Sequence, residues 1–276
     1  MPATMRNAQF VAALSGSDLS HGQVAYGDKP DQVAEIIAPP DAHGRPLVIV
    51  VHGGFWRSVY DRGHTVGQCM ALAREGYVAA ALEYRRVGNG GGWPVTFADV
   101  AAGLDALPGL LGDVIDPDRV ALMGHSAGGH LVLWAAGRHN LPVNAPGHRA
   151  GPAPLRGVIA LGAVADLHWA EEHRAGNSAA LDLMGAPMDS PDGRWDAADP
   201  ARLLPTGIPT VLLHGQHDDA VPVGCANSYV QAAQAAGDPC RMKFLPGVGH
   251  FEFIDPRSVA WPHVMTAVDG LVGAAT

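Results

Sequence analysis

The chain has 276 residues, of which 47% are apolar and 16% are charged, and its formal net charge is −9. This balance is that of a globular protein and argues against a disordered or fibrous chain. The only lysines are Lys29 and Lys243. Such an acidic chain lacks the basic surface that nucleic acid or an anionic membrane would need, so we expect neither as a partner.

Short apolar runs rich in Val, Ile, Leu and Ala recur along the chain, at 47–51, 78–82, 120–123, 158–161 and 210–213. Near-continuous runs of this kind are typical of strands that are buried on both faces. Further strands are expected at 32–38 and 241–245. Helix-like segments separate the strands, at 62–75, 97–107, 126–138, 223–236 and 258–270. This alternation predicts an α/β fold with a mostly parallel, doubly wound sheet.

One stretch interrupts the alternation. Residues 166–205 contain Trp169, a helix-like segment at 178–184 and a run rich in Pro, Asp and Gly, and they are too long for a simple connection. We expect an insertion that forms a lid or pocket wall on a single domain spanning 1–276. The first 30 residues have no clear periodicity and are expected to wrap the body of the domain.

Targeting signals and cofactor sites are not expected. The apolar run at 10–14 is shorter than the core of a signal peptide, about 7–15 residues. No stretch approaches the roughly 18–20 apolar residues of a membrane helix, so a cytoplasmic protein is expected. Cys69, Cys225 and Cys240 are too few for a disulfide framework. The 14 histidines have no metal-binding spacing, so no metal or other cofactor is expected.

The sequence GHSAG at 124–128 lies between a predicted strand and a predicted helix. In the pattern G-x-S-x-G, this context places a serine on a tight turn where its hydroxyl is exposed above the sheet. Ser126 is therefore the predicted nucleophile. The amide N–H groups at the start of the following helix favour negative charge nearby.

The sequence HGGFW at 52–56 follows another predicted strand. Its glycines allow backbone N–H groups to approach a ligand closely, as acyl transfer requires where negative charge develops on the carbonyl oxygen. We expect the amides of Gly54, Phe55 and Ala127 to form this oxyanion hole. His52 is expected to brace the loop.

An acid and a base follow in the order that a Ser-Asp-His triad requires. Asp218 and Asp219 both lie just beyond the predicted strand at 210–213, where a carboxylate can orient a histidine. His250 lies in a glycine-rich loop after the last predicted strand and is the predicted base.

On these motifs the chain resembles the α/β-hydrolase superfamily, over residues 32–271. It is most similar to small esterases that include hormone-sensitive-lipase-like enzymes and kynurenine formamidases. The H-G-G-x-W pattern is found at 52–56, followed by Tyr84-Arg85, Pro94 and Asp99. The sequence at 214–222 matches H-G-x-x-D-x-x-V-P, and this match selects Asp218 over Asp219.

Phe55 stands where lipase-like members have a third glycine, which favours the formamidase-like group. The resemblance implies a cofactor-independent serine hydrolase with the triad Ser126, Asp218 and His250. Its substrate would be a small ester or amide, with N-formylkynurenine the most specific candidate.

Other functions remain open at this point. A short-chain carboxylesterase or a carbohydrate acyl esterase fits the same motifs, and a peptidase or a non-catalytic binding module is less favoured. Trp56, Trp93 and Trp169 are candidates for an aromatic substrate pocket, with core packing as the alternative. The oligomeric state is not determined by the sequence, and a homodimer is compatible with it.

Overall fold

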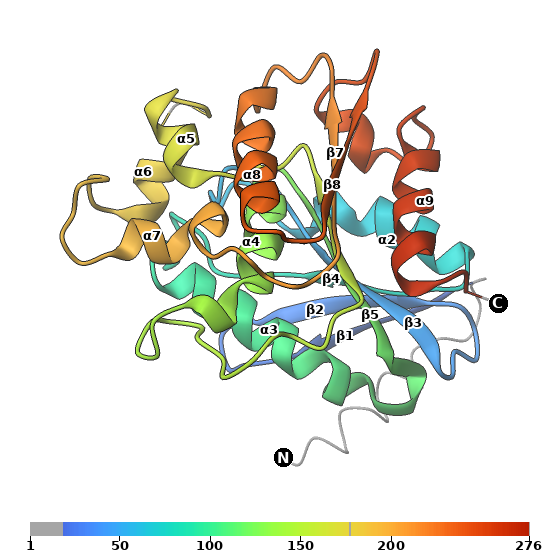
Figure 1. Ribbon diagram of the computed structural model, residues 1–276. Helices are drawn as coiled ribbons and strands as arrows, with labels where there is room; N and C mark the ends of the chain where they lie inside the picture. The colour runs from blue at the N-terminus through green and yellow to red at the C-terminus, as the bar shows by residue number, and fades with distance from the viewer. Residues whose placement is uncertain (1–18, 177, 276) are drawn as a thin grey trace.

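The computed structural model describes residues 19–176 and 178–275, and within them the strands form one mixed sheet in the order β1-β2-β4-β3-β5-β6-β7-β8 (Figure 1). Their bounds are β1 (Ser20–Ala25), β2 (Val33–Ala38), β3 (Arg45–Val51), β4 (Val78–Leu82), β5 (Ile115–His125), β6 (Gly157–Leu161), β7 (Thr210–Gly215) and β8 (Cys240–Leu245). The strands β4, β3, β5, β6, β7 and β8 are parallel to one another. Strand β2 is antiparallel to both of its neighbours, β1 and β4. This is the predicted α/β-hydrolase arrangement.

Helices cover both faces of the sheet. On one face lie α3 (Val95–Leu111), α4 (Ala127–Ala136) and α8 (Val223–Ala235), and on the other lie α2 (Val66–Arg74) and α9 (Trp261–Val272). Strand β3 shows why both faces are apolar, because Ile49 packs into the first layer and its neighbours Val48 and Val50 pack into the second. A strand with two buried faces needs a continuous apolar run, as the sequence indicated.

Short helices fill the long connection between β6 and β7. They are α5 (Leu167–Glu172), α6 (Ala179–Met184), α7 (Arg194–Ala198) and the 3-10 turn η4 (Pro200–Arg202). They gather beside α8, on the side of the molecule away from α9 (Figure 1). Four further 3-10 turns lie in the described residues: η1 (Arg62–Thr65), η2 (Gly112–Val114), η3 (Arg138–Asn140) and η5 (Phe251–Ile254).

The beginning of the chain differs in part from the sequence-based expectation. Residues 20–25 form the edge strand β1, which pairs with β2 and was not predicted. Its sequence, SHGQVA, is mostly polar and only Val24 is buried, so it carries no apolar run. The apolar run at 10–14 lies outside the described residues.

The expectation about membrane-spanning stretches also needs correction. The helical stretch Val95–Val114 is long and apolar enough to cross a membrane by length and composition alone. Half of it is buried inside the protein, where α3 packs against α4 and β5. Its composition therefore matches that of a helix packed in the core of a globular protein.

Candidate active site

Ser126 lies on the turn between β5 and α4 in a rarely populated backbone conformation, with φ 56° and ψ −119°. Its amide N–H donates to the carbonyl oxygen of Leu161 at 2.8 Å, which ties the turn to the end of β6. The side chain of Ser126 therefore stands at the carboxyl edge of the sheet, where loops of α/β proteins carry their ligands. Backbone strain at such a position is a feature of functional sites.

The glycines on either side of Ser126 are required by close backbone approach. A Cβ on Gly124 would lie 2.3 Å from the carbonyl oxygen of Gly128, and a Cβ on Gly128 would lie 2.0 Å from that of Val51. Both distances are far below van der Waals contact, so neither position accepts a larger residue without displacing backbone. The G-x-S-x-G spacing thus follows from the packing of the turn against β3.

His250 and Asp218 lie together, although 32 residues separate them. The Nδ1 atom of His250 is 2.8 Å from Oδ2 of Asp218, and both side chains are almost fully buried. Gly162, which follows β6, packs against this pair, and a Cβ there would lie 3.0 Å from Oδ2 of Asp218. Among the described residues no hydrogen bond links Ser126 to His250, and such contacts are often long without substrate.

Asp218 is held as an ionised acceptor. Its second oxygen, Oδ1, accepts from the backbone N–H groups of Ala220 at 3.1 Å and Val221 at 2.8 Å. Burial raises the pKa of Asp218, but the hydrogen bond and charge of His250 and the bond from Val221 outweigh it and lower that pKa below the usual range. Asp219 is exposed, so the geometry favours Asp218 as the partner of His250.

His125, the variable residue of the G-x-S-x-G motif, also contributes to the site. Its Nε2 donates to the backbone oxygen of His250 at 2.9 Å, and the two rings are 4.4 Å apart. Burial, together with neighbouring His250, lowers the pKa of His125 to about 3, so this ring is neutral. Sequence reasoning missed this role, because nothing in the motif indicates what the variable residue touches.

The predicted oxyanion loop lies directly against the serine turn. A Cβ on Gly53 would lie 3.0 Å from Cβ of Ser126. Within the described residues the backbone N–H groups of Gly54 and Phe55 donate to no protein acceptor. Ala127, the first residue of α4, has no partner inside its own helix. Unpaired donors beside a serine are what stabilisation of an oxyanion requires.

Phe55 and Trp56 both have left-handed backbone conformations, with φ 53° and 55°. Glycine adopts this conformation without strain, whereas Phe and Trp side chains rarely do. The ring of Phe55 packs on Gly176 of the insertion, where a Cβ would lie 2.5 Å away. Two consecutive strained residues again mark this loop as functional.

A small apolar hollow separates the oxyanion loop from the insertion. Its volume is about 10 Å³, near the minimum that one water molecule requires. The residues that line it are Phe55, Trp56, Val164, Ala170, Ala175, Gly176, Ala180, Ala220 and Val221. Ser126, Asp218 and His250 are not among these residues, but Val164 in its wall donates its amide N–H to the carbonyl oxygen of Ser126 at 3.3 Å.

The structure places one of the three predicted pocket tryptophans at this hollow. Trp56 lines it and is only 1% exposed. Trp93 and Trp169 do not line it. Trp93 packs edge-on against Phe97, and Trp169 stacks on His173 and lies over Gly224.

Two larger clefts, of about 470 Å³ and 500 Å³, lie elsewhere. They are lined by residues at the amino ends of β5, β7 and β8, such as Val120, Thr210 and Cys240, so they are remote from Ser126. No group of three metal-binding side chains comes together in the described part of the chain. The carboxyl edge with Ser126 is thus the candidate site.

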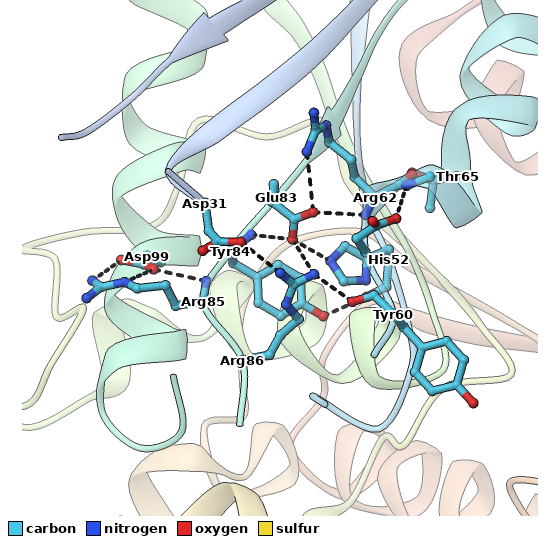
Figure 2. Close-up of polar contacts among 12 residues, drawn as sticks. Asp31, His52, Tyr60, Arg62, Thr65, Glu83, Tyr84, Arg85, Arg86 and Asp99 are labelled. Atoms are coloured by element: carbon cyan, nitrogen blue, oxygen red, sulfur yellow. Dashed lines mark hydrogen bonds and ion pairs between the residues drawn. The ribbon is translucent and has the colours of Figure 1, made fainter. Parts of the chain in front are cut away.

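A second buried polar cluster lies behind the oxyanion loop (Figure 2). Glu83, at the end of β4, contacts His52, Arg62 and Arg86, and the Tyr84-Arg85 motif follows it. The guanidinium of Arg85 forms two hydrogen bonds with the buried Asp99, at 2.7 and 2.6 Å, and the backbone amide of Arg85 forms a third at 3.1 Å, which explains why the motif pairs these residues. His52 braces the loop, with its Nδ1 2.8 Å from the carbonyl oxygen of Gly53.

A sequence model of the BD-FAE family matches residues 35–232, which is more than half of the chain. The chain belongs to the BD-FAE family. This match includes Ser126 and Asp218 and ends before His250.

Curated relatives of this BD-FAE member include esterases and dipeptidyl peptidases. The esterase LipC of Mycobacterium tuberculosis is 28% identical over 92% of the chain and 66% of its own length. The isoprenylcysteine alpha-carbonyl methylesterase ICME of Arabidopsis thaliana is 26% identical over 82% of the chain and 55% of its own length. The chain therefore spans between about half and two thirds of these relatives.

Solved structures share the fold. Esterase Est2 of Thermogutta terrifontis is 21% identical with a TM-score of 0.70, covering 91% of this chain and 90% of its own. A truncated carbohydrate esterase from gut microbiota is 18% identical with a TM-score of 0.75, covering 96% and 98%. These likenesses confirm the α/β-hydrolase fold of this BD-FAE member.

Because Asp218 and not Asp219 contacts His250, substitutions of these two neighbouring residues should have different effects on kcat. Asp218→Asn should reduce kcat by about 10⁴, because His250 loses the group that fixes its tautomer and orientation. Asp219→Asn is the matched control and should change kcat little, since Asp219 is exposed. Steady-state kinetics on one ester measures both, and a larger loss for the Asp219 variant would contradict the assignment.

Buried neutral histidines predict an acid-labile fold. Burial lowers the pKa of His130 to about 4, and that of His125 is about 3. The unfolded chain therefore binds more protons than the folded chain between about pH 4 and 6.5. The free energy of unfolding should rise with pH across that range, by up to about 1.4 kcal/mol per pH unit for each histidine.

Denaturant unfolding at several pH values measures this slope. His130→Gln should reduce it while keeping a donor for the carbonyl oxygen of Ala198, which His130 contacts at 2.9 Å. The control His217→Gln removes an exposed histidine and should leave the slope unchanged. An unchanged slope in the His130 variant would contradict the prediction.

Proposed function

We propose that this protein is a serine carboxylesterase that hydrolyses small esters through an acyl-enzyme, with Ser126, His250 and Asp218 as its triad. The observation that carries the proposal is the strained turn that presents Ser126 beside a buried His250–Asp218 pair, with a 2.8 Å hydrogen bond between them. The esterase relatives named above support the same activity.

In the proposed reaction, Ser126 attacks the ester carbonyl while Nε2 of His250 accepts its proton. Asp218 keeps Nδ1 of His250 protonated and stabilises the imidazolium that forms. The amides of Gly54, Phe55 and Ala127 donate to the oxyanion of the tetrahedral intermediate. His250 then protonates the leaving alcohol, and water hydrolyses the acyl-enzyme by the same steps in reverse order.

Ester hydrolysis is favoured over the hydrolysis of N-formylkynurenine. The esterase LipC and the methylesterase ICME match over 92% and 82% of the chain, whereas the dipeptidyl-peptidase 5 of Aspergillus oryzae matches over 78%. The H-G-G-x-W motif is the feature that favours a formamidase, so the formamide remains the alternative substrate for this site. One substrate panel of p-nitrophenyl esters and an N-formyl anilide separates the two.

The size of the hollow supports a small acyl group. The hollow of about 10 Å³ between the oxyanion loop and the insertion is near the minimum that one water molecule requires, so a long acyl chain that entered it would have to displace the ring of Phe55. The leaving group faces the open side of the site, near the exposed Phe251 that follows His250. We therefore expect selectivity for the acyl group to exceed selectivity for the alcohol.

The nucleophile is tested by Ser126→Ala. This variant should stay folded and lose turnover by about 10⁶ in kcat, because the acyl-enzyme has no hydroxyl on which to form. A fluorophosphonate should label the native protein with one group per chain and should not label the variant. Full labelling of the variant would contradict Ser126 as the nucleophile.

Phe55→Gly tests the small acyl group. The native protein should prefer p-nitrophenyl acetate over the octanoate by about 10- to 200-fold in kcat/KM. Removing the ring should narrow this preference, and glycine accepts the φ of 53° without strain. The control Phe244→Ala removes an exposed ring on β8 and should leave the preference unchanged. A native preference for octanoate would exclude a small acyl site.

A further inference from the structure

Both ring nitrogens of His52 face hydrogen-bond acceptors. Nδ1 lies 2.8 Å from the carbonyl oxygen of Gly53, and Nε2 lies 3.0 Å from Oε1 of Glu83. A carbonyl oxygen only accepts, and so does an ionised carboxylate. A neutral imidazole has a single N–H, so one of these two contacts would bring a nitrogen lone pair against an oxygen lone pair. The geometry requires an N–H on each nitrogen.

Glu83 is fixed as an ionised carboxylate. Although burial raises its pKa, hydrogen bonds and charges from His52, Arg62 and Arg86 lower that pKa to about 2. Oε1 also accepts from the amide of Tyr84 at 3.0 Å, and Oε2 accepts from the amide of Arg62 at 3.1 Å. A carboxylate that is 2% exposed and held by two backbone amides cannot turn away from His52.

The face of the ring is also suited to a cation. The ring of Tyr84 stacks on that of His52 with centroids 4.4 Å apart and an interplanar angle of 17°. Aromatic faces attract cations, and the attraction increases when water is excluded. The hydroxyl of Tyr84 donates to the backbone oxygen of His52 at 2.8 Å, which fixes this stacking (Figure 2).

The contact of His52 with Gly53 acts on the oxyanion hole through one peptide unit. The carbonyl of Gly53 and the N–H of Gly54 belong to the same planar group and point in opposite directions. A donor on that carbonyl therefore fixes the direction of the Gly54 N–H. It also polarises the amide, which makes its N–H a stronger donor. Gly53 itself packs against Ser126, so this peptide unit is beside the reacting atoms.

We propose that His52 and Glu83 are positioning residues for the oxyanion hole. Glu83 holds His52 as a buried imidazolium, and this cation orients and polarises the Gly53–Gly54 peptide, so that the Gly54 N–H is directed at the substrate oxyanion. The proposal rests on the serine esterase function proposed above. It predicts that loss of either residue weakens binding of the transition state more than binding of the ester.

Glu83→Gln tests the charge, and Asp99→Asn is its matched control. Both carboxylates are buried and paired with an arginine, but Asp99 contacts Arg85 and Gln32 and has no contact with His52. Glu83→Gln should lower kcat by about 10- to 100-fold with KM little changed. This decrease is no larger than that caused by removing one oxyanion donor outright, which is about 100- to 1,000-fold. Asp99→Asn should leave kcat unchanged even if it lowers the melting temperature.

Two variants of His52 separate the donor from the charge. The amide of His52→Asn reaches the position of Nδ1 and can still donate to Gly53, whereas that of His52→Gln reaches the position of Nε2 and contacts Glu83 alone. His52→Asn should therefore keep more activity than His52→Gln. For each variant, the affinity for a trifluoromethyl ketone, which forms an oxyanion on Ser126, should fall in parallel with kcat/KM.

Nitrogen NMR of the native protein decides the proposal if the variants fail to fold. His52 should show a proton on each of its two ring nitrogens in the native protein. A single protonated nitrogen, or an unchanged kcat in folded Glu83→Gln, would overturn the proposal. Failure of the esterase function is distinguishable, because the native protein would then show neither turnover nor labelling of Ser126.

Discussion

The serine turn depends on how closely it packs against strand β3. Gly128 lies so near the carbonyl oxygens of Val51 and His52 that a Cβ there would overlap both, at 2.0 and 2.6 Å. This contact sets the height of Ser126 above the sheet and also places the loop that follows β3 beside it. The nucleophile and the oxyanion donors are therefore aligned by one backbone contact between neighbouring parallel strands.

The charged groups buried behind the oxyanion loop are paired with one another, which offsets the free energy lost when they leave water. Arg86, Glu83 and Asp99 are at most 4% exposed, and each has charged partners and backbone contacts. Such pairing makes buried charge tolerable and restricts the orientation of each side chain, although Nε of Arg86 has no hydrogen-bond partner among the described residues. Among these groups, Glu83 supports the oxyanion loop through its contact with His52.

The sequence predicted the parallel core well, because strands buried on both faces need continuous apolar runs such as those of β3 and β7. The edge strand β1 escaped prediction, since only Val24 of its six residues is buried. Sequence motifs predicted Ser126, Asp218 and His250 as the members of the triad. They did not indicate that Trp93 and Trp169 pack away from the hollow, or that Glu83 faces His52. Those facts depend on which atoms meet across the fold.

Two carboxylate–histidine pairs flank the central strand β5, and they differ in what their second nitrogen meets. His250 bonds Asp218 through Nδ1, and its Nε2 contacts no acceptor among the described residues, so it remains available to accept a proton. His52 meets an acceptor at each nitrogen and has no lone pair to offer. The first pair therefore has the chemistry of a base, and the second has that of a fixed positive donor. The His250–Asp218 and His52–Glu83 pairs consist of the same two chemical groups, yet they have opposite roles. The difference comes from one additional oxygen atom, the carbonyl oxygen of Gly53, beside His52.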